Sequence, residues 1–186
     1  MNPDCESDER KVVRFRETGE AAILNELVRR HLPRTRGMIH AMVLNHADAD
    51  DLTQEVFVRM ARGLASFRAK SKFSTWLYAI ALNTTRSFLV RRVRTQPTGE
   101  PFDSTVSAPG HARPDRMMMA SELDGRISAA LASLSPSLRA AITLTVLEEF
   151  DVAEAARIEG CRTATMYWRV HQARKKLKVL LGPDLT

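Results

Sequence analysis

The stretch DVAEAARIEGCRTATMYWRVHQARKKLK, Asp151–Lys178, decides the fold of the C-terminal part of this chain. Asp151 is a favoured N-cap residue and Gly160 a favoured stop residue, so a short helix is predicted over Val152–Glu159. A second helix is predicted from Thr163 to Leu181, because apolar residues recur at four- and three-residue spacing: Met166, Val170, Ala173, Leu177 and Leu180. Two helices joined by a glycine-containing turn form the helix-turn-helix arrangement.

The charge of this stretch favours a polyanionic ligand. From Arg157 to Lys178 there are seven basic residues and one acid, and the whole chain has a formal net charge of +6. In a helix-turn-helix the second helix enters the major groove, with its N-terminal residues nearest the base edges. We therefore expect contact with duplex DNA. Two alternatives remain: the basic run is a solvated helix end, and Trp168, which lies off the apolar stripe, packs against a neighbouring helix instead of touching DNA.

Upstream of this motif the chain divides into two blocks. Ser135-Pro136 predicts the start of a helix that runs to about Phe150, although Ile142–Leu147 alternates as a β-strand does. An earlier helix is expected over Ala120–Leu134. The stretch from Thr95 to Met119 holds four prolines and two glycines and has no helical period, which is typical of a flexible linker.

The N-terminal block is also expected to be helical. Helices are predicted over Glu9–Glu17, over Glu20–Leu44 with a kink at Pro33, and over Phe73–Arg94. The fold class is therefore all-α, with two small helical domains at residues 1–94 and 120–186 and a linker at residues 95–119.

A further helix is predicted from DADDLTQEVFVRM, Asp48–Met60, an acidic stretch in a basic protein. Asp48 is the expected N-cap, with Asp50 and Asp51 in the first turn, where acids complement the helix dipole. The apolar stripe of this helix is Leu52, Val56, Met60 and Leu64. Capping alone explains the early acids, but it explains Gln54 and Glu55 less well, because they lie past the first turn.

The next segment is basic and aromatic. From Arg68 to Arg94 there are seven basic residues and no acid, and the aromatic residues of the region are Phe67, Phe73, Trp76, Tyr78 and Phe88. Aromatic faces hold unstacked bases and cations hold the backbone, so the composition suits single-stranded DNA. The alternative is that these aromatic residues are core, and we expect this for at least half of them.

Several classes of protein are disfavoured. Cys5 and Cys161 form no Cys-x-x-Cys pair, and the histidines show no metal-ligand spacing, so we expect no metal, no cofactor and no catalytic residue. The acidic N-terminus has no apolar signal segment, and Trp76–Leu82 is too short to span a bilayer. The expectation is a cytoplasmic protein without direct membrane insertion that is not an enzyme.

Three motifs, in this order, resemble the extracytoplasmic-function (ECF) sigma factors of bacterial RNA polymerase. They are DADDLTQEVFVRM at Asp48–Met60, FRAKSKFSTWLYAIALNTTRSFLVRR at Phe67–Arg92, and the stretch from Leu131 to Lys178 that contains the helix-turn-helix. The resemblance implies a sigma region 2 helical bundle and a sigma region 4 helix-turn-helix, which direct promoter recognition and transcription initiation. The implied partners are the RNA polymerase core (β′ clamp helices and β subunit), promoter DNA and an anti-sigma factor.

The resemblance also implies roles for residues. The core-polymerase-binding set is Asp51, Gln54, Glu55 and Phe57. The set for binding and melting the −10 element is Arg68, Lys70, Lys72, Ser74, Thr75, Trp76, Asn83 and Arg86, with a flipped base held at the loop 67–72. The set for reading the −35 element as duplex is Arg162, Thr163, Thr165, Tyr167, Trp168, Arg169, His171 and Arg174.

Two departures from the family pattern bear on the −35 preference. Glu159 stands where the family usually has an apolar residue, and Tyr167-Trp168 stands where it often has Lys-Ser. A rival hypothesis is a helix-turn-helix regulator that binds duplex DNA without being a polymerase subunit. That hypothesis explains the C-terminal block but neither the acidic helix nor the basic-aromatic segment.

Overall fold

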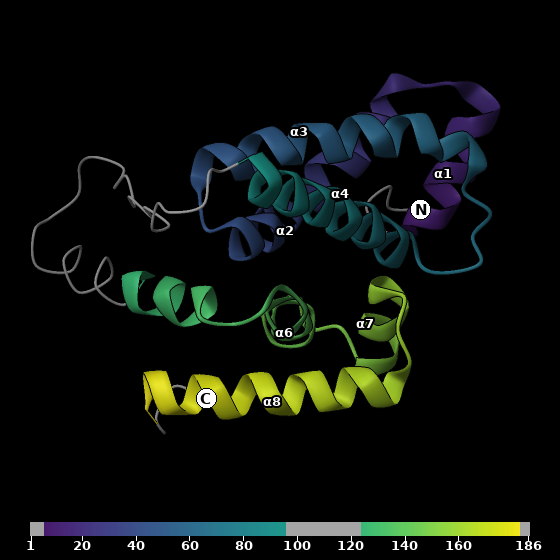
Figure 1. Ribbon diagram of the computed structural model, residues 1–186. Coiled ribbons are helices and arrows are strands. Elements are labelled where there is room, and N and C mark those ends of the chain that lie inside the picture. The colour runs from purple at the N-terminus through teal and green to yellow at the C-terminus, as the bar shows by residue number, and fades with distance from the viewer. Residues whose placement is uncertain (1–5, 96–123, 183–186) are drawn as a thin grey trace, which may run out of the picture.

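The computed structural model describes residues 6–95 and 124–182, and every regular element in these two ranges is helical (Figure 1). The N-terminal half, residues 6–95, is a bundle of helices that pack on one another. Its elements are α1 (Asp8–Thr18), α2 (Ala21–Val43), α3 (His46–Gly63), the short 3₁₀-helix η2 (Leu64–Ser66) and α4 (Phe73–Thr95). The all-α fold class predicted from the sequence is confirmed.

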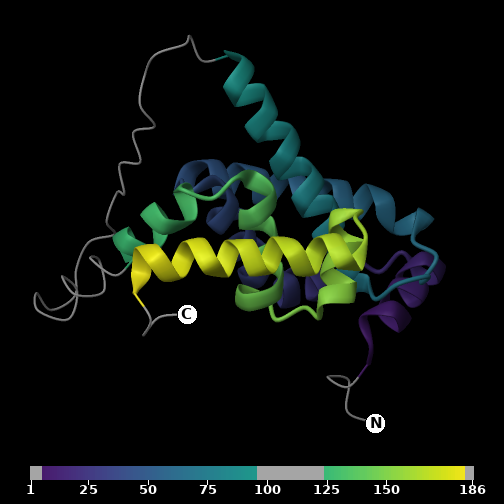
Figure 2. The same cartoon turned by 60° about the horizontal axis from the view of Figure 1, so that its bottom comes forward.

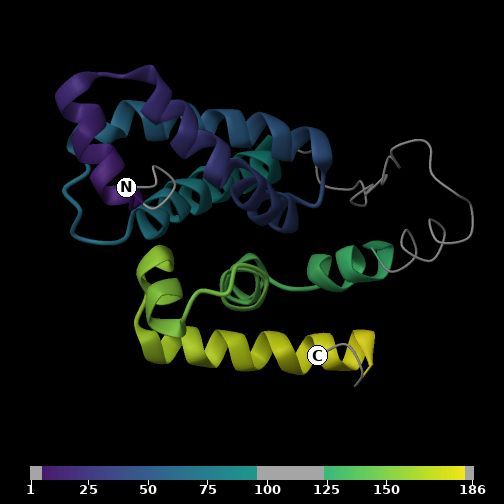
Figure 3. The same cartoon turned by 180° about the vertical axis from the view of Figure 1, so that it is seen from behind.

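The C-terminal half, residues 124–182, lies against one side of this bundle (Figures 1 and 3). It begins with a helix at residues 124–132. Then come α6 (Pro136–Ile142), the π-helical segment η3 (Thr143–Leu147), α7 (Val152–Glu159) and α8 (Thr163–Leu181). In the view of Figure 2, α8 lies in front of the N-terminal helices.

The helix-turn-helix forms as the sequence predicts. The side chain of Asp151 accepts a hydrogen bond from the backbone N–H of Glu154 at 2.7 Å, which makes Asp151 the N-cap of α7. Gly160 ends α7 with φ of 67°, in the left-handed region that favours glycine. The last helix has the predicted bounds, Thr163 to Leu181.

Two helix boundaries differ from the prediction. The N-cap of α3 is Asn45, whose side chain accepts a hydrogen bond from the backbone N–H of Asp48 at 3.0 Å, so the prediction of Asp48 as the cap is wrong. The helix from Pro136 ends at Leu147 rather than Phe150, because the chain turns at Glu149, whose φ is 58°. The β-strand alternative for Ile142–Leu147 is also wrong, since the backbone there is helical.

Pro33 lies inside α2, which continues to Val43. The predicted linker falls almost entirely outside the described residues, as do the first residues of the predicted helix Ala120–Leu134. No helix in the described ranges is long and apolar enough to cross a membrane.

One apolar cluster runs through both halves and packs them together. It contains residues of α2, α3 and α4 as well as residues of η3, α7 and α8, such as Leu77 and Leu82 from α4 and Ala155 and Ile158 from α7. Helix α7 packs on α4, and α6 and η3 both pack on α2. We call this packing of the two halves the closed arrangement.

Polar contacts join the two halves around Glu148, which is buried. The hydroxyl of Tyr78 in α4 donates a hydrogen bond to the Glu148 carboxylate. Arg34 in α2 donates to the same carboxylate at 3.2 Å and to the Glu148 carbonyl at 2.7 Å. Arg139 in α6 donates to the carbonyl of Met42 at 2.7 Å. The ring of Tyr78 also meets that of Phe150 edge-on, with centroids 4.8 Å apart.

Candidate nucleic-acid interface

The first half of α8 presents two large aromatic side chains to solvent. Tyr167 and Trp168 are 61% and 60% exposed, so the alternative in which Trp168 packs against a neighbouring helix is wrong for this structure. The exposed members of the predicted −35 set are Arg162, Thr163, Tyr167, Trp168, His171 and Arg174, whereas Thr165 and Arg169 are half-buried. The α8 stripe of Met166, Val170, Ala173 and Leu177 is buried and orients the exposed side chains outward.

The predicted −10 set divides between a loop and α4. Arg68, Lys70 and Lys72 are exposed in the loop 67–72, and Asn83 is exposed on α4. Ser74 and Arg86 are half-buried. Thr75 is buried, and its hydroxyl has no hydrogen-bond partner among the described residues.

Trp76 lies in an aromatic cluster rather than free in solvent. Its ring is 5.1 Å from that of Phe67 and 5.8 Å from that of Phe73, measured between centroids. It also lies close over Gly63, where an added Cβ would come within 2.9 Å of the Trp76 ring. Phe67, Phe73 and Tyr78 are buried, which agrees with the expectation that at least half of these aromatic residues are core.

Glu159 joins the two predicted DNA-binding sets. Its carboxylate forms one ion pair with Arg86 of α4 and another with Arg169 of α8. The Glu159 side chain is 0% exposed, whereas those of Arg86 and Arg169 are 31% and 22% exposed. The oxygen that faces Arg169 receives no hydrogen bond of good geometry, so that contact is an ion pair only. We call this group the Glu159 bridge.

The Glu159 bridge pairs two partly buried cations with one buried carboxylate. Burial lowers the pKa of Arg86 from its ordinary value, yet an arginine stays charged at any physiological pH. A second contact of the same kind joins Lys72 of the loop to Glu154 of α7, 2.6 Å apart. Three basic residues from the predicted DNA-binding sets are thus paired with carboxylates of α7.

The acidic helix α3 divides its acids between its own chain and solvent. Asp48 pairs with Arg92, and Asp50 pairs with Arg36. The hydrogen bond with Arg36 lowers the pKa of Asp50 below its usual value. Asp51 and Gln54 are exposed.

The other members of the core-polymerase set lie differently. Glu55 is 39% exposed and pairs with Arg59 one turn on. Phe57 packs in the core at 9% exposed, so three of the four members lie at the surface.

Several contacts of this region are absent from the sequence-based prediction. Arg59 donates to the hydroxyl of Thr84 at 3.2 Å and lines a shallow hollow with Arg86 and Arg91. The departure of Glu159 from the family pattern was a visible signal, but its partners, 73 residues earlier in the chain for Arg86, were not. Among the described residues no group of three His, Cys, Asp or Glu side chains is placed to hold a metal ion.

The described residues define the class of the protein: they are all-helical and include a helix-turn-helix, α7 and α8. The family model for Sigma-70 region 2 matches residues 27–95, and the model for Sigma-70 region 4 matches residues 124–177. The chain is 30% identical over 187 residues to the RNA polymerase sigma-H factor of Pseudomonas aeruginosa, covering 97% of this chain and 96% of that one. It is 32% identical over 172 residues to the ECF RNA polymerase sigma-E factor of Escherichia coli strain K12, covering 89% and 90%.

A solved structure agrees with these relatives. The sigma factor RpoE from Bartonella quintana, crystallised in complex with the anti-sigma factor NepR, has a TM-score of 0.72 and 28% identity. The match covers 86% of this chain and 97% of that one. The chain belongs to the ECF sigma factors of RNA polymerase.

Proposed function

We propose that this protein directs RNA polymerase core to a set of promoters and supports initiation there, as an ECF-type sigma subunit. One observation carries the proposal beyond family membership. A single chain combines an exposed helix suited to duplex readout with a loop and helix that bring cations and aromatic rings together. A regulator that binds only duplex DNA needs the first surface and not the second, so the rival hypothesis is disfavoured.

The proposed division of labour follows the two surfaces. Residues 1–94 act as sigma region 2, which binds core polymerase and opens the −10 element, and residues 120–186 act as sigma region 4, which reads the −35 element. The exposed acids of α3 give a surface of opposite sign to a basic partner, which supports a role in binding polymerase. The polymerase performs the phosphoryl transfer, and the site of action is the cytoplasm, where core enzyme and promoter meet.

The closed arrangement is proposed to be a form that does not engage a promoter. The −10 and −35 elements are about 25 base pairs apart, which is roughly 85 Å along the duplex at 3.4 Å per base pair. Arg86 and Arg169, one from each proposed DNA-binding set, meet on the same carboxylate. A chain with both residues on Glu159 does not reach both elements, so initiation requires the two halves to separate.

An anti-sigma factor is the proposed regulator of this separation. The relative from Bartonella quintana was solved with such a factor, and its fold matches over most of this chain. A partner that binds the closed arrangement more tightly than the separated halves would lower the amount of active sigma subunit by mass action.

The test is run-off transcription with purified core polymerase. We expect the protein to convert core enzyme, which initiates without specificity, into an enzyme that starts transcripts at defined positions. Sequencing the transcript starts then yields the −10 and −35 elements. A pull-down that captures core polymerase in a one-to-one ratio supports the proposal, and protein that binds DNA but neither retains core enzyme nor directs transcript starts contradicts it.

A further inference from the structure

The N-terminal helix α1 contacts both ends of the loop 67–72, the segment to which the resemblance to ECF sigma factors assigns capture of a flipped base at the −10 element. At the start of the loop, Arg16 donates a hydrogen bond to the carbonyl of Phe67, 3.4 Å away. At its end, the backbone N–H of Phe73 donates to the carboxylate of Glu9 at 2.7 Å. Phe73 is the first residue of α4, so Glu9 caps a helix that begins 64 residues later in the chain.

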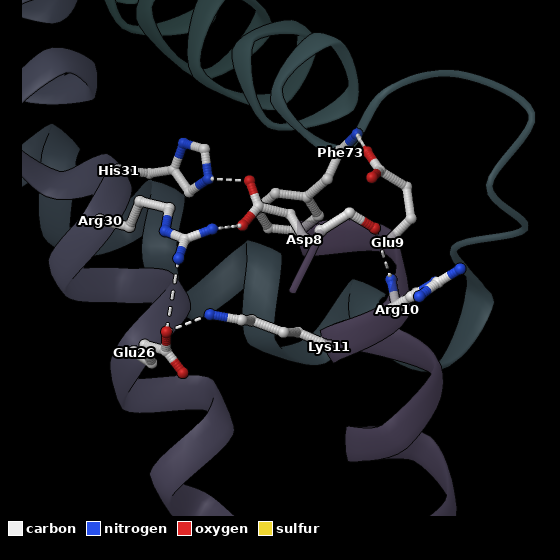
Figure 4. A network of polar contacts seen from close by, with 9 residues as sticks. Asp8, Glu9, Arg10, Lys11, Glu26, Arg30, His31 and Phe73 are labelled. Carbon is white, nitrogen blue, oxygen red and sulfur yellow. Dashed lines mark hydrogen bonds and ion pairs between the residues drawn. The ribbon is translucent and has the colours of Figure 1, made fainter. Parts of the chain in front are cut away.

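Glu9 is held in place by neighbours that fix α1 on α2 (Figure 4). Asp8 accepts one hydrogen bond from Arg30 at 2.7 Å and contacts the ring of His31 at 2.8 Å. Lys11 is 1% exposed and pairs with Glu26. Burial alone would raise the pKa of Asp8, but the bond to His31 and the charge of Arg30 hold it below its usual value. These contacts fix the backbone of α1 on both sides of Glu9 and so keep its carboxylate near the Phe73 N–H.

The loop that these bonds hold has a constrained conformation. Ala69, near its tip, has φ of 51°, a left-handed backbone that non-glycine residues rarely adopt without support from their surroundings. Between the loop tip and α1 lies an open hollow of about 420 Å³, lined by Ala69 on one side and by Glu9, Arg10 and Val13 among others from α1. A shift of α1 therefore changes the shape of the loop and of the space beside it.

We propose that α1 is the positioning element for this loop, with Glu9 and Arg16 as the positioning residues. The inference rests on the proposed function, because it assigns α1 to base capture at the −10 element. Neither family match includes α1, since the region 2 match begins at residue 27. The bond from Glu9 fixes where α4 begins, and the bond from Arg16 fixes where the loop leaves η2, so the two together set the geometry in which the loop meets an unstacked base.

The experiment measures base discrimination rather than activity alone. Holoenzyme is reconstituted from core polymerase and each sigma variant, and open complex is measured by permanganate reactivity on promoters that differ at one −10 position. The quantity of interest is the ratio between the preferred base and the other bases. A variant that only reduces the amount of folded sigma lowers the signal on every template equally and leaves this ratio unchanged.

The variants are Glu9→Ala, Glu9→Gln and Arg16→Ala. The controls are Glu20→Ala and Arg29→Ala, which remove exposed side chains of the same types, the first just before α2 and the second within its first half. We expect Glu9→Ala to lower the ratio about five-fold, the factor that corresponds to one lost capping hydrogen bond. Arg16→Ala removes an exposed donor 3.4 Å from its acceptor and should lower the ratio by a smaller factor. Glu9→Gln keeps an acceptor oxygen and should restore the ratio, and both controls should match the unmodified protein.

Two results would overturn the proposal: an unchanged ratio in Glu9→Ala and Arg16→Ala, or a loss in Glu9→Gln as large as in Glu9→Ala. If the unmodified protein opens no promoter at all, the proposed function itself fails and this inference fails with it, an outcome that is visible before any variant is made.

Discussion

Removing the Arg86 side chain should strengthen the binding of this basic protein to −35 duplex DNA. Arg86 belongs to α4 in the N-terminal half, and its guanidinium pairs with Glu159 of the helix-turn-helix. Simple electrostatics predicts the opposite, because loss of a cation weakens attraction to a polyanion. The Glu159 bridge reverses the sign, since Arg86→Ala weakens the attachment of the C-terminal half to the N-terminal half without removing a proposed −35 contact.

The size of the effect follows from the geometry of the bridge. Truncating one partner of a buried, hydrogen-bonded charge pair at an interface costs about 2–5 kcal/mol. The low end applies here, because Arg86 is 31% exposed and Glu159 keeps Arg169 as a partner. A loss of about 2 kcal/mol shifts the equilibrium between closed and separated halves by roughly thirty-fold. The gain in apparent affinity is bounded by this factor, because only the fraction of separated molecules binds.

Glu159→Gln tests the same equilibrium from the other side. It keeps the shape of the side chain and removes the charge that both arginines share, so it should also raise −35 affinity. Glu149→Gln is the matched control, because Glu149 is an exposed carboxylate of the same half, in the turn between η3 and α7. Its closed arrangement and its DNA affinity should equal those of the unmodified chain.

The assay pairs fluorescence anisotropy on a short −35 duplex with small-angle scattering of the free protein. We expect Arg86→Ala and Glu159→Gln to bind the duplex more tightly and to have a larger radius of gyration. The reasoning is refuted if Arg86→Ala binds the −35 duplex as weakly as the unmodified protein, or more weakly, and keeps its compact dimensions. Closure would then not depend on this carboxylate.

Three further outcomes are expected. Gln54→Lys on α3 should weaken binding to core polymerase in a competition assay at unchanged unfolding temperature, because the side chain is exposed and a new cation would face a basic partner. Trp168→Ala should weaken binding to the −35 duplex by roughly ten-fold, as loss of an interface aromatic commonly does, with little effect on stability at 60% exposure. The closed arrangement should tighten as pH falls, measured by energy transfer between labels on the two halves. Burial raises the pKa of Glu148, which faces Tyr78 and Arg34, so the closed form binds more protons than the separated halves. Closure therefore strengthens as pH falls from this raised value to the ordinary carboxyl value.

Each of these outcomes has a matched control. Asn25→Lys adds the same charge at an exposed position of α2 and should leave polymerase binding unchanged. Leu180→Ala removes an exposed apolar side chain from the far end of α8 and should leave −35 binding unchanged. Glu148→Gln should remove the pH dependence of closure. A chain that still closes more tightly at low pH without this carboxyl would show that another group titrates.

Most helices could be predicted because their signals are local. Asp151 and Gly160 bracket α7 within ten residues of each other, and the stripe of α8 needs only its own sequence. The two helix boundaries that were predicted wrongly also depend on local signals, but those signals were ambiguous. Asn45 and Asp48 are both favoured N-cap residues, and only the extended backbone of Asn45, with φ of −140°, decides between them. At Glu149 a positive φ ends the helical run, although no glycine or proline at that position predicts a helix end.

The polar contacts between the halves could not be predicted from one sequence, because the pairing of charged residues follows no sequence period. Nothing near Glu159 in the chain points to Arg86, and nothing near Glu9 points to the N–H of Phe73. The same holds for Glu148, which a sequence reading assigns to a helix end and the structure buries against Tyr78 and Arg34. Burial of a carboxylate is tolerated only where partners exist, so these contacts are specified by tertiary packing rather than by local pattern.

The chemistry of these contacts explains why a closed arrangement can also be a reversible one. A guanidinium pairs with a carboxylate or with a phosphate through the same donors, so the arginines on Glu159 can exchange one anion for the other without a change in their own charge. An apolar side chain at position 159, as the family usually has, could pack against neighbouring helices but could not compete with DNA for a cation. Glu159 pairs with one arginine from each half. Whether the two halves stay packed together therefore depends on whether these arginines are bound to Glu159 or to DNA phosphate. Of the two ion pairs only Arg86–Glu159 crosses between the halves, so phosphate that takes Arg86 from Glu159 favours their separation. Engagement of the −10 element through Arg86 should therefore favour engagement of the −35 element by the separated C-terminal half.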